Sequence, residues 1–475
     1  MTFRKYPEYK DSGVEWLGEV PAHWEVYRLK HSVESCRNGI WGQEPTGDSN
    51  DLPCVRVADF DRARLRVVLD DPTLRNVKPG ERKGRVLKRG NLVLEKSGGG
   101  ENQPVGFVVL YDDDRDAVCS NFTAKMALAD RMDASFWRYV HAAAYAIRLN
   151  FPSIKQTSGI QNLDQQSYLD ERAAYPPNDE QSRIAAFLDH ETTRIDALVE
   201  EQKRLIELLK EKRQAVISHA VTKGLDPDVP MKDSGVEWLG EVPKHWDIFP
   251  AKFLFHFVTS GSRGWAEYYS DSGNIFFRIT NLSKDSIQPK LNSIQYVSPP
   301  DDSEGSRAKI KSGDILVSIT ADLGSVCAAN EDVKGGYVSQ HVALARPNQE
   351  VRSSEWLAYF ILGDAAKEQL LGSGYGGTKV QLSLKDVGEL VVAVPPKNEQ
   401  VAISEELTSR LSEMDTLADE ATHAAELLSE RRSALISAAV TGKIDVRNWA
   451  THANAEPESY AMAAEPKAAY ETNSS

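Results

Sequence analysis

The sequence contains few cysteines and no long hydrophobic run. Its four cysteines, Cys36, Cys54, Cys119 and Cys327, lie far apart and form no CxxC pair, so neither a zinc site nor a disulfide framework is predicted. Scattered cysteines favour a reducing compartment, and we expect the cytoplasm. No apolar segment reaches the roughly 18 residues that a membrane-spanning helix needs, and the first residues lack the apolar stretch of a signal peptide. We therefore expect no membrane association.

The sequence also lacks the motifs of several enzyme classes. Its 10 histidines form no HExxH or HxH ligand set. The Gly-rich segment 372–380 differs from a phosphate-binding loop, because Thr378 separates the last glycine from Lys379. The Pro-Pro pairs do not stand in the Asn/Asp-Pro-Pro-aromatic motif of DNA amino-methyltransferases, and no carboxylate–lysine cluster of a nuclease is evident. We predict no catalytic residue, no metal site and no cofactor site, which leaves a recognition protein.

What the sequence has instead is an internal repeat. Lys10–Trp24 reads KDSGVEWLGEVPAHW and Lys232–Trp246 reads KDSGVEWLGEVPKHW, with Ala22 replaced by Lys244 as the single difference. A repeat of this length predicts that the chain is one structural unit written twice. The length of 475 residues, too great for a single hydrophobic core, agrees with two domains and their connectors.

Shorter matches extend the repeat at the ends of each unit, whereas the middles have diverged. Arg56–Phe60 matches Arg278–Leu282, and near the unit ends 176–181 matches 395–400 and 211–218 matches 430–437. Between the matched ends, segments 25–175 and 247–394 keep almost the same length but little identity. Neutral drift after a duplication is the alternative, but drift would not spare the ends and erase the middles. We therefore predict one fold that carries two different surfaces.

A long helix is predicted after each Pro-Pro-x-x-Glu-Gln segment. Both stretches are free of Gly and Pro, Asn178 or Asp179 can cap the first helix, and Gly224 and Gly442 fit the two ends. The apolar residues follow the alternating spacing of a coiled-coil seam. The seam comprises Ile184, Leu188, Ile195, Leu198, Leu205, Leu209 and Val216 in the first stretch and Ile403, Leu407, Met414, Leu417, Ala424, Leu428 and Leu435 in the second.

Two homologous helices that close on each other about an approximate two-fold axis run antiparallel. Glu191 would then face Arg431 favourably, but the related pair, Lys212 and Arg410, is repulsive, so charge leaves the register open. A helix over 178–219 would measure roughly 63 Å and would act as a spacer.

The predicted fold class is mixed α/β (α+β), with two globular domains joined by two long antiparallel coiled-coil helices in a pseudo-two-fold repeat. The predicted segments are 1–176 (first domain), 177–225 (first helical spacer), 226–395 (second domain), 396–446 (second helical spacer) and 447–475 (a tail). The tail is rich in Ala, Glu and Ser without an apolar seam, so we expect it to be disordered.

Two loops in each domain, together with a basic segment, are the candidate contacts for nucleic acid. The net charge is -14, yet segment 62–96 holds many more Lys and Arg than acidic residues; such an excess can meet phosphates or be an ordinary solvated face. One loop follows a predicted buried strand and the other precedes the last strand, and their glycines and polar residues can approach phosphates or base edges. The candidate DNA-binding residues are Arg56, Lys96, Ser97, Asn102, Gln103, Lys155, Gln156, Thr157, Arg263, Arg278, Asn281, Thr320, Tyr375, Thr378 and Lys379.

Taken in order, these motifs carry a family resemblance. The duplicated Ser-Gly-Val-Glu-Trp-Leu-Gly-x-x-Pro-x-His-Trp openings, the Pro-Pro-x-x-Glu-Gln segments and the Arg-x-Ala-Val/Leu-Ile-Ser segments resemble the specificity subunits of Type I restriction-modification systems over about residues 7–446. The resemblance implies two target-recognition domains, each reading half of a bipartite site in double-stranded DNA. It also implies two methyltransferase subunits that use S-adenosylmethionine, and restriction subunits that use ATP and Mg. These cofactors would belong to the partners, and this chain would perform no catalysis.

Segments that are alike in both units should contact something that is present twice. We therefore predict that the openings and the helix faces support either the core or the methyltransferase interface, with packing as the favoured role of the tryptophans. The residues concerned are Glu15, Trp16, Glu237, Trp238, Leu198, Leu205, Leu417 and Leu428. A coiled-coil scaffold that binds proteins without touching DNA is the alternative function.

Overall fold

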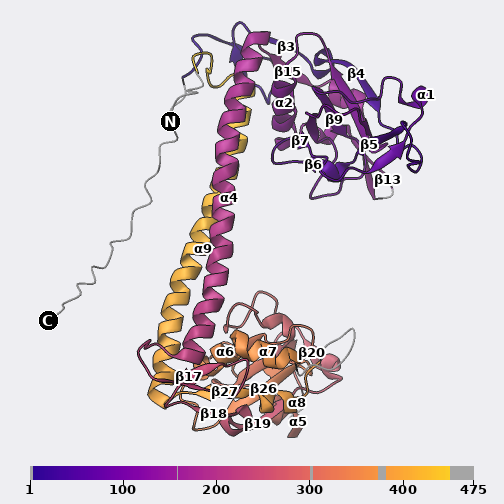
Figure 1. Cartoon of the computed structure of the whole chain (residues 1–475). Coiled ribbons are helices and arrows are strands. Elements are labelled where there is room, and N and C mark those ends of the chain that lie inside the picture. Colours follow the sequence, from indigo (N-terminus) through magenta and orange to yellow (C-terminus); the bar gives the residue numbers. More distant parts are fainter. Residues whose placement is uncertain (1–3, 158, 300–302, 373–380, 450–475) are drawn as a thin grey trace, which may run out of the picture. The chain divides into compact units, whose positions relative to one another are not determined.

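The computed structural model describes residues 4–157, 159–299, 303–372 and 381–449. It divides into two compact units: unit 1 comprises residues 1–201 and 424–475, and unit 2 comprises residues 202–423. Both divisions fall inside long helices, α4 (Asn178–Lys223) and α9 (Lys397–Val440), so each unit holds one domain and a part of each helix (Figure 1). Within the described ranges, no helix is long and apolar enough to cross a membrane.

The domain of unit 1 is built around a six-stranded sheet in the order β4-β12-β9-β10-β7-β6. Its central strand β9 is buried from Leu92 to Glu95, as expected of a strand covered on both faces, and α2 packs against β9 and β10. The strands are β1 (Tyr9–Asp11), β2 (Glu19–Pro21), β3 (Glu25–Arg28), β4 (Val33–Asn38), β5 (Asp51–Val55), β6 (Phe60–Asp61), β7 (Arg66–Val67), β8 (Leu74–Asn76), β9 (Asn91–Glu95), β10 (Val108–Tyr111), β11 (Val118–Cys119), β12 (Thr123–Leu128), β13 (Ile154–Thr157), β14 (Ile160–Leu163) and β15 (Arg172–Tyr175), and the shorter helices are α1 (Pro79–Arg82), α2 (Ala134–Ala146) and α3 (Gln165–Leu169).

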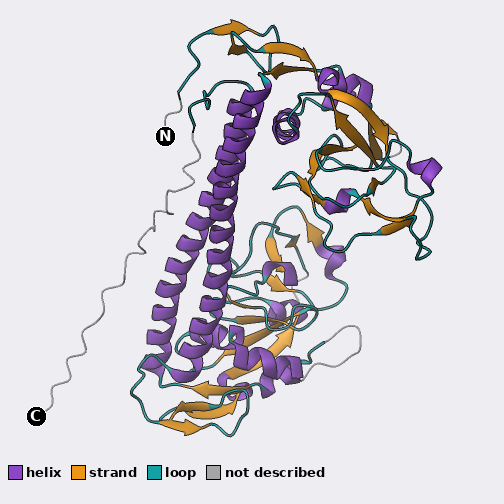
Figure 2. Cartoon of the chain, turned by 45° about the horizontal axis from the view of Figure 1, so that its top comes forward, coloured by secondary structure: helices purple, strands orange, loops and turns teal. Residues whose placement is uncertain are grey.

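The domain of unit 2 contains two four-stranded sheets, in the orders β19-β26-β23-β24 and β20-β22-β21-β25. Figure 2 shows a similar mixture of strands and short helices in both domains. The strands of unit 2 are β16 (Met231–Asp233), β17 (Glu241–Pro243), β18 (Asp247–Pro250), β19 (Phe255–Ser260), β20 (Tyr269–Ser270), β21 (Asn274–Phe277), β22 (Tyr296–Val297), β23 (Ile315–Ser318), β24 (Val326–Ala328), β25 (Tyr337–Val338), β26 (Val342–Pro347) and β27 (Val391–Val394), and the shorter helices are α5 (Ser303–Ala308), α6 (Ser354–Leu362), α7 (Asp364–Gly372) and α8 (Leu384–Glu389).

The two domains share their pattern of strand pairing. β15 pairs antiparallel with β3 as β27 pairs with β18, and β11 pairs parallel with β5 as β25 pairs with β21. Likewise, β12 lies between β4 and β9 as β26 lies between β19 and β23. The predicted fold class, a mixed α/β repeat with two long helices, is confirmed.

The repeated opening motif of each unit is fastened to the first turn of a long helix. In unit 1, His23 Nε2 lies 2.9 Å from Glu180 Oε2 at the start of α4. In unit 2, His245 Nε2 lies 2.7 Å from Glu399 Oε1 at the start of α9, and the Trp246 indole N–H donates to the other oxygen of Glu399 at 2.9 Å. The opening motif and the Pro-Pro-x-x-Glu-Gln motif therefore recur together because they bind each other.

The ends of the long helices pack against the same motifs. Gly442 follows α9 with φ +71°, and a Cβ there would lie 2.3 Å from Cδ of Pro21. Gly224 follows α4 with φ +79°, and a Cβ there would lie 3.3 Å from the Trp246 ring. Glycine is favoured at both helix ends because of the left-handed backbone, and at Gly442 also because of the close approach of proline. These helix ends confirm the two glycines predicted from the sequence.

Within each unit, α4 and α9 run antiparallel and are joined by an ion pair. Arg432 Nε lies 2.8 Å from Asp196 Oδ1 in unit 1, and Arg213 Nη1 lies 2.5 Å from Asp415 Oδ1 in unit 2. The two pairs are copies of each other in the repeat, because the two arginines occupy matching positions, as do the two aspartates. The charges within the seam left the register of the two helices open. The ion pairs found in the observed register are formed by residues outside the seam.

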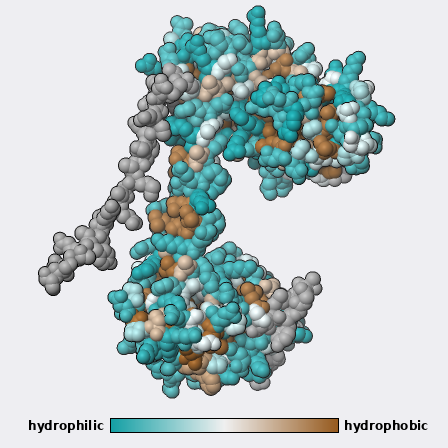
Figure 3. All heavy atoms as spheres, in the orientation of Figure 1, coloured by the Kyte–Doolittle hydropathy of each residue, from teal (hydrophilic) through white to brown (hydrophobic). Residues whose placement is uncertain are grey.

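The buried seam between the helices is shorter than predicted. Ile184 and Leu188 are fully buried, whereas Leu198, Leu205 and Leu417 are 43%, 41% and 48% exposed. Two paired helices bury only a narrow stripe of each other's surface, so these three leucines lie outside the buried seam. Figure 3 shows hydrophobic side chains on the visible face of the helices, among hydrophilic ones.

The described part of the chain continues slightly past the predicted start of the tail. Trp449 packs its ring against Phe187 of α4, with ring centroids 5.5 Å apart, and Arg447 binds Asp445 through Nε at 2.9 Å. The prediction that the tail begins at 447 is therefore wrong by these first residues, because an apolar ring finds a partner on α4. The rest of the predicted tail, 450–475, lies outside the described residues.

Candidate nucleic-acid interface

A pocket of about 420 Å³ in the domain of unit 1 brings together three of the predicted DNA-binding residues. Ser97 and Gln103 lie on the loop after β9, Arg56 follows β5, and each of the three lines this pocket. The remaining lining residues are Trp41, Val57, Ala58, Glu95, Gly98, Gly99, Gly100, Ser120 and Phe122. We call this the aromatic pocket, after Trp41 and Phe122.

Arg56 is held at the pocket by a neighbouring carboxylate. Its backbone N–H donates to Asp59 Oδ2 at 2.7 Å, and its guanidinium Nη2 donates to Asp59 Oδ1 at 2.9 Å. The side chain remains 39% exposed. Asp59 therefore orients Arg56 and offsets part of its charge, while the free edge of the guanidinium can meet a base or a phosphate.

The loop after β9 and the β13–β14 hairpin form one continuous surface beside the pocket. Lys96 Nζ donates to Asn38 Oδ1 at 2.5 Å, and Ser97 Oγ donates to Asn162 Oδ1 at 2.5 Å. Lys155 lies on β13 and binds Asp164 Oδ2 at 2.7 Å, so its charge is matched within the domain. Asn102 and Gln156 are exposed. Thr157 ends β13, and its side chain lies outside the described part of the structure.

The floor of the aromatic pocket carries a buried carboxyl group. Glu95 is 2% exposed and accepts a hydrogen bond from Arg62 Nη2 at 2.7 Å. Burial raises the pKa of Glu95, while Arg62 acts in the opposite direction. Arg62 also stacks over the Phe107 ring, 4.4 Å from its centroid. Gln103 faces Arg62 across the loop, so the loop is fastened to the floor of the pocket.

Positions in the domain of unit 2 can be matched to those of the aromatic pocket. Gly39 and Gly261 occupy equivalent places, because a Cβ at either would clash with backbone oxygens of the strand β11 or β25 region. Trp41 follows Gly39 by two residues, as Arg263 follows Gly261. The Phe122 carbonyl accepts the N–H of Lys96 at 2.8 Å, and the His341 carbonyl accepts that of Ile319 at 3.1 Å. Trp41 and Phe122 of unit 1 therefore correspond to Arg263 and His341 of unit 2.

Arg278 occupies the place of Arg56 in unit 2, but with a different neighbour. Asn281 replaces the aspartate: its Oδ1 accepts the backbone N–H of Arg278 at 3.0 Å, and its Nδ2 donates to Lys290 O and Ser293 O. Asn281 is 1% exposed, so its prediction as a DNA contact is wrong, because its amide is buried and already bonded. Because Asn281 is uncharged, it does not offset the guanidinium charge of Arg278 as Asp59 offsets that of Arg56.

The remaining predicted residues of unit 2 are spread over its surface. Arg263 is exposed, and Thr320 is half-buried in a bridge with Gln381, in the place that Ser97 and Asn162 occupy in unit 1. Three more predicted contacts, Tyr375, Thr378 and Lys379, lie outside the described residues.

The aromatic residues of the pocket were missed by sequence reasoning. Trp41 and Phe122 are 38% and 47% exposed, whereas isolated aromatic residues in a strand-rich segment usually indicate core. Comparing the two repeats could have identified these two positions. A core position is expected to stay apolar in both copies, whereas Arg263 and His341 are polar.

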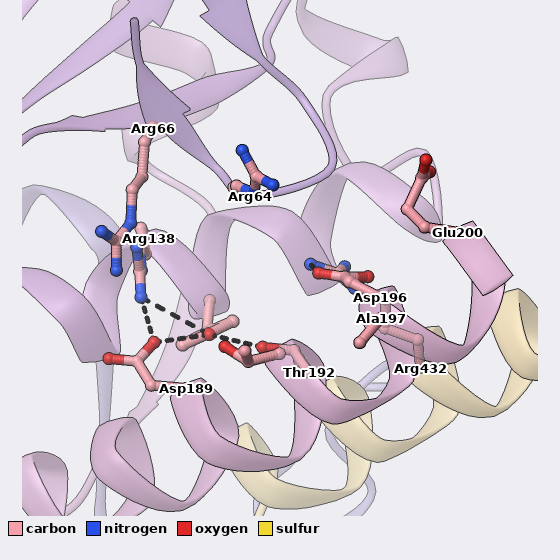
Figure 4. Close-up of a pocket in the computed structure, with 11 residues that line it drawn as sticks. Arg64, Arg66, Arg138, Asp189, Thr192, Asp196, Ala197, Glu200 and Arg432 are labelled. Atoms are coloured by element: carbon pink, nitrogen blue, oxygen red, sulfur yellow. Dashed lines mark hydrogen bonds and ion pairs between the residues drawn. The ribbon is translucent and has the colours of Figure 1, made fainter.

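A second pocket of unit 1, about 330 Å³ in volume, contains four arginines but no surplus of positive charge. Figure 4 shows Arg138 joined to Asp189, with Arg64 and Arg66 above it and Arg432 farther along the helices. Each arginine has a carboxylate partner: Arg64 with Asp61, Arg66 with Asp112, Arg138 with Asp189 and Arg432 with Asp196. At the places of Arg138 and Asp189, unit 2 carries Leu357 and Thr408. This cluster therefore reads as structural.

The residues predicted for the core or the partner interface fall into two groups. Trp16 donates its indole N–H to Arg172 O at 3.0 Å, and Leu428 packs against the core of unit 1. Glu15, Glu237 and Trp238 are exposed, and so are the three leucines outside the seam. The packing role expected of both tryptophans does not apply to Trp238, which is 45% exposed.

Comparison with known proteins agrees with this architecture. Residues 270–420 match the family model of the Type I restriction modification DNA specificity domain. The chain is 22% identical to a protein described as the MjaX type I restriction enzyme specificity subunit of Methanocaldococcus jannaschii, over 94% of this chain and 99% of that protein. It is also 22% identical to the EcoBI specificity subunit of Escherichia coli, over 63% of each chain. The family model and these relatives show that the chain is similar to Type I specificity subunits.

Solved structures share the fold of this chain. A chain from a structure of a type I restriction-modification complex superposes with a TM-score of 0.68 at 17% identity, over 89% of this chain and 98% of that one. The HsdS subunit from Thermoanaerobacter tengcongensis gives a TM-score of 0.54 at 16% identity, over 90% and 98%. Because these matches span nearly the whole of each neighbour, both units belong to the shared architecture.

Proposed function

We propose that this specificity subunit reads a bipartite site in double-stranded DNA, with one domain for each half-site. Differences at equivalent positions carry the proposal. The repeat keeps the strand pairing, the histidine–glutamate contacts and the inter-helix ion pairs, yet the recognition positions hold Trp41 and Phe122 in unit 1 and Arg263 and His341 in unit 2. One scaffold that presents two different surfaces suits two different half-sites.

The subunit also recruits two methyltransferase subunits, and restriction subunits through them. This part is supported by exposed groups that occur in both copies of the repeat: Glu15 and Glu237 in the openings, and Leu198 and Leu417 on the helices. Groups duplicated in this way suit a partner that binds twice. The methyltransferases would supply S-adenosylmethionine, and the restriction subunits would use ATP and Mg.

Domain replacement tests the reading of half-sites. Residues 25–175 are replaced by the equivalent domain of a relative, and residues 247–394 are replaced in a matched second variant. Methylated adenines are then mapped across the genome of a host that carries each complex. Each replacement should change one half of the methylated site and leave the other half as it was. An unchanged site in an active complex would refute the proposal and favour a protein-binding scaffold.

Helix length tests the spacer role. Seven residues are inserted after Leu205 of α4, together with seven at the facing position near His423 of α9, so that helical phase and pairing are kept. At about 1.5 Å per residue, the insertion adds about 10 Å to both helices. The spacer between the half-sites should lengthen by about three base pairs, at roughly 3.4 Å each. An active complex with the original spacer would contradict this role.

A further inference from the structure

The aromatic pocket of unit 1 presents two exposed rings to one hollow. Trp41 and Phe122 both line it, although they come from segments far apart in the chain. The Trp41 ring is fixed by Arg75, whose guanidinium lies 4.6 Å from the ring centroid and binds Glu44 at 2.5 Å. The volume of about 420 Å³ lies in the range of roughly 300–1,000 Å³ that is usual for small-molecule pockets.

Polar groups at the same pocket suit a ligand with a hydrogen-bonding edge. Arg56 contributes a guanidinium held in place by Asp59, and Ser97 and Gln103 contribute a hydroxyl and an amide. Gly98, with φ +109°, lets the loop backbone run beside the Phe122 ring without a side chain of its own. A nucleobase pocket usually contains aromatic rings that stack on the base. It also contains hydrogen-bond donors and acceptors that contact the edge of the base.

The fold does not require the two rings. Arg263 and His341 stand at the matching positions of unit 2, on the same strand arrangement. Since the scaffold accepts polar residues there, packing alone does not explain an exposed tryptophan and an exposed phenylalanine in unit 1. Both rings are exposed to solvent, so ligand binding explains their presence better than packing does.

We propose that the aromatic pocket takes up one unstacked nucleobase from the half-site that unit 1 reads. This inference rests on the proposed function and adds a binding mode to it. A base pair within a duplex shows only its edges in the grooves, and its faces are covered by neighbouring pairs. Stacking on Trp41 or Phe122 therefore requires a base that has left the helix, after which Arg56, Ser97 and Gln103 can read its edge.

The test uses the complex with its methyltransferase subunits and a panel of duplexes. Each duplex contains the mapped site with a mismatch at one position of the half-site assigned to unit 1. A mismatch lowers the cost of unstacking, so one position other than the methylated adenine should bind at least about fivefold more tightly. Trp41→Ala/Phe122→Ala should abolish this gain. The matched unit 2 variant, Arg263→Ala/His341→Ala, should retain it.

A second variant guards against misfolding. Trp41→Arg/Phe122→His copies the residues of unit 2, should unfold in denaturant like the natural chain and should lose the gain. The inference is overturned if no position besides the methylated adenine gains from a mismatch, or if the gain persists in both aromatic variants. Failure of the proposed function looks different, because the unaltered complex would then show no sequence-specific DNA binding at all.

Discussion

The stability of unit 1 should depend on pH through one buried histidine. His141 of α2 is fully buried, its Nδ1 lies 2.8 Å from Tyr168 Oη, and its Nε2 has no partner within the described residues. Burial lowers the pKa of His141 from 6.5 to about 4. Because the folded value lies below the unfolded one, the stabilisation is complete above pH 6.5 and is lost as the pH falls towards 4. From these two values, unit 1 should lose about 2 kcal/mol of unfolding free energy between pH 7 and pH 5.

Unit 2 supplies the design of the variant, since Phe360 and Val387 occupy the places of His141 and Tyr168. His141→Phe/Tyr168→Phe should fold and should lose about 2 kcal/mol less than the natural chain between pH 7 and pH 5. Tyr168→Phe alone, which keeps the histidine, should still lose about as much as the natural chain. Denaturant unfolding at both pH values, with hydrogen exchange of α2 peptides as the local probe, measures these differences. Equal losses in the natural chain and the double variant would refute the argument.

Three further predictions follow from the charged contacts. Asp415→Arg should lower the unfolding free energy of unit 2 by about 1 kcal/mol, and adding Arg213→Asp should restore part of it; a double variant no more stable than the single one in denaturant unfolding would contradict the pairing. Asp189→Thr leaves buried Arg138 uncompensated and should lower the unfolding free energy by about 3 kcal/mol. Adding Arg138→Leu, which copies unit 2, should recover most of that loss in thermal unfolding. Equal stabilities of the single and the double variant would contradict this prediction. Lys96→Ala should weaken DNA binding alike for all sequences and reduce the slope of log affinity against log salt by about one, and an unchanged slope would exclude a phosphate contact.

The repeat and its helices could be predicted because their signals are local or nearly identical. The two fifteen-residue openings established the duplication, and proline pairs and glycines marked the helix ends at Gly224 and Gly442. The register between the helices could not be derived in the same way. The observed register is accompanied by the ion pairs Arg213–Asp415 and Arg432–Asp196. Their residues lie beside the seam, and a prediction from the apolar seam does not consider such positions.

The candidate site was predictable only in part. The fold gathers three of the predicted residues, Arg56, Ser97 and Gln103, at one pocket, and their contact with DNA stays a prediction. Asn281 was misjudged because a sequence does not show that an amide is already bonded to neighbouring carbonyls. Trp41 was missed because the exposure of an aromatic side chain depends on tertiary packing, which no spacing reveals.

The core of unit 1 includes residues from the far end of the chain. Leu435, Val440 and Ile444 belong to its hydrophobic cluster, and the backbone N–H of Asp445 donates to Arg4 O at 2.7 Å. Unit 2, by contrast, is one continuous segment, 202–423. During synthesis, which proceeds from the N-terminus, the domain that leaves the ribosome first is the last to acquire its full core. Unit 2 can complete its core as soon as α9 begins to emerge from the ribosome. The domain of unit 1 is therefore synthesised first but completes its core last.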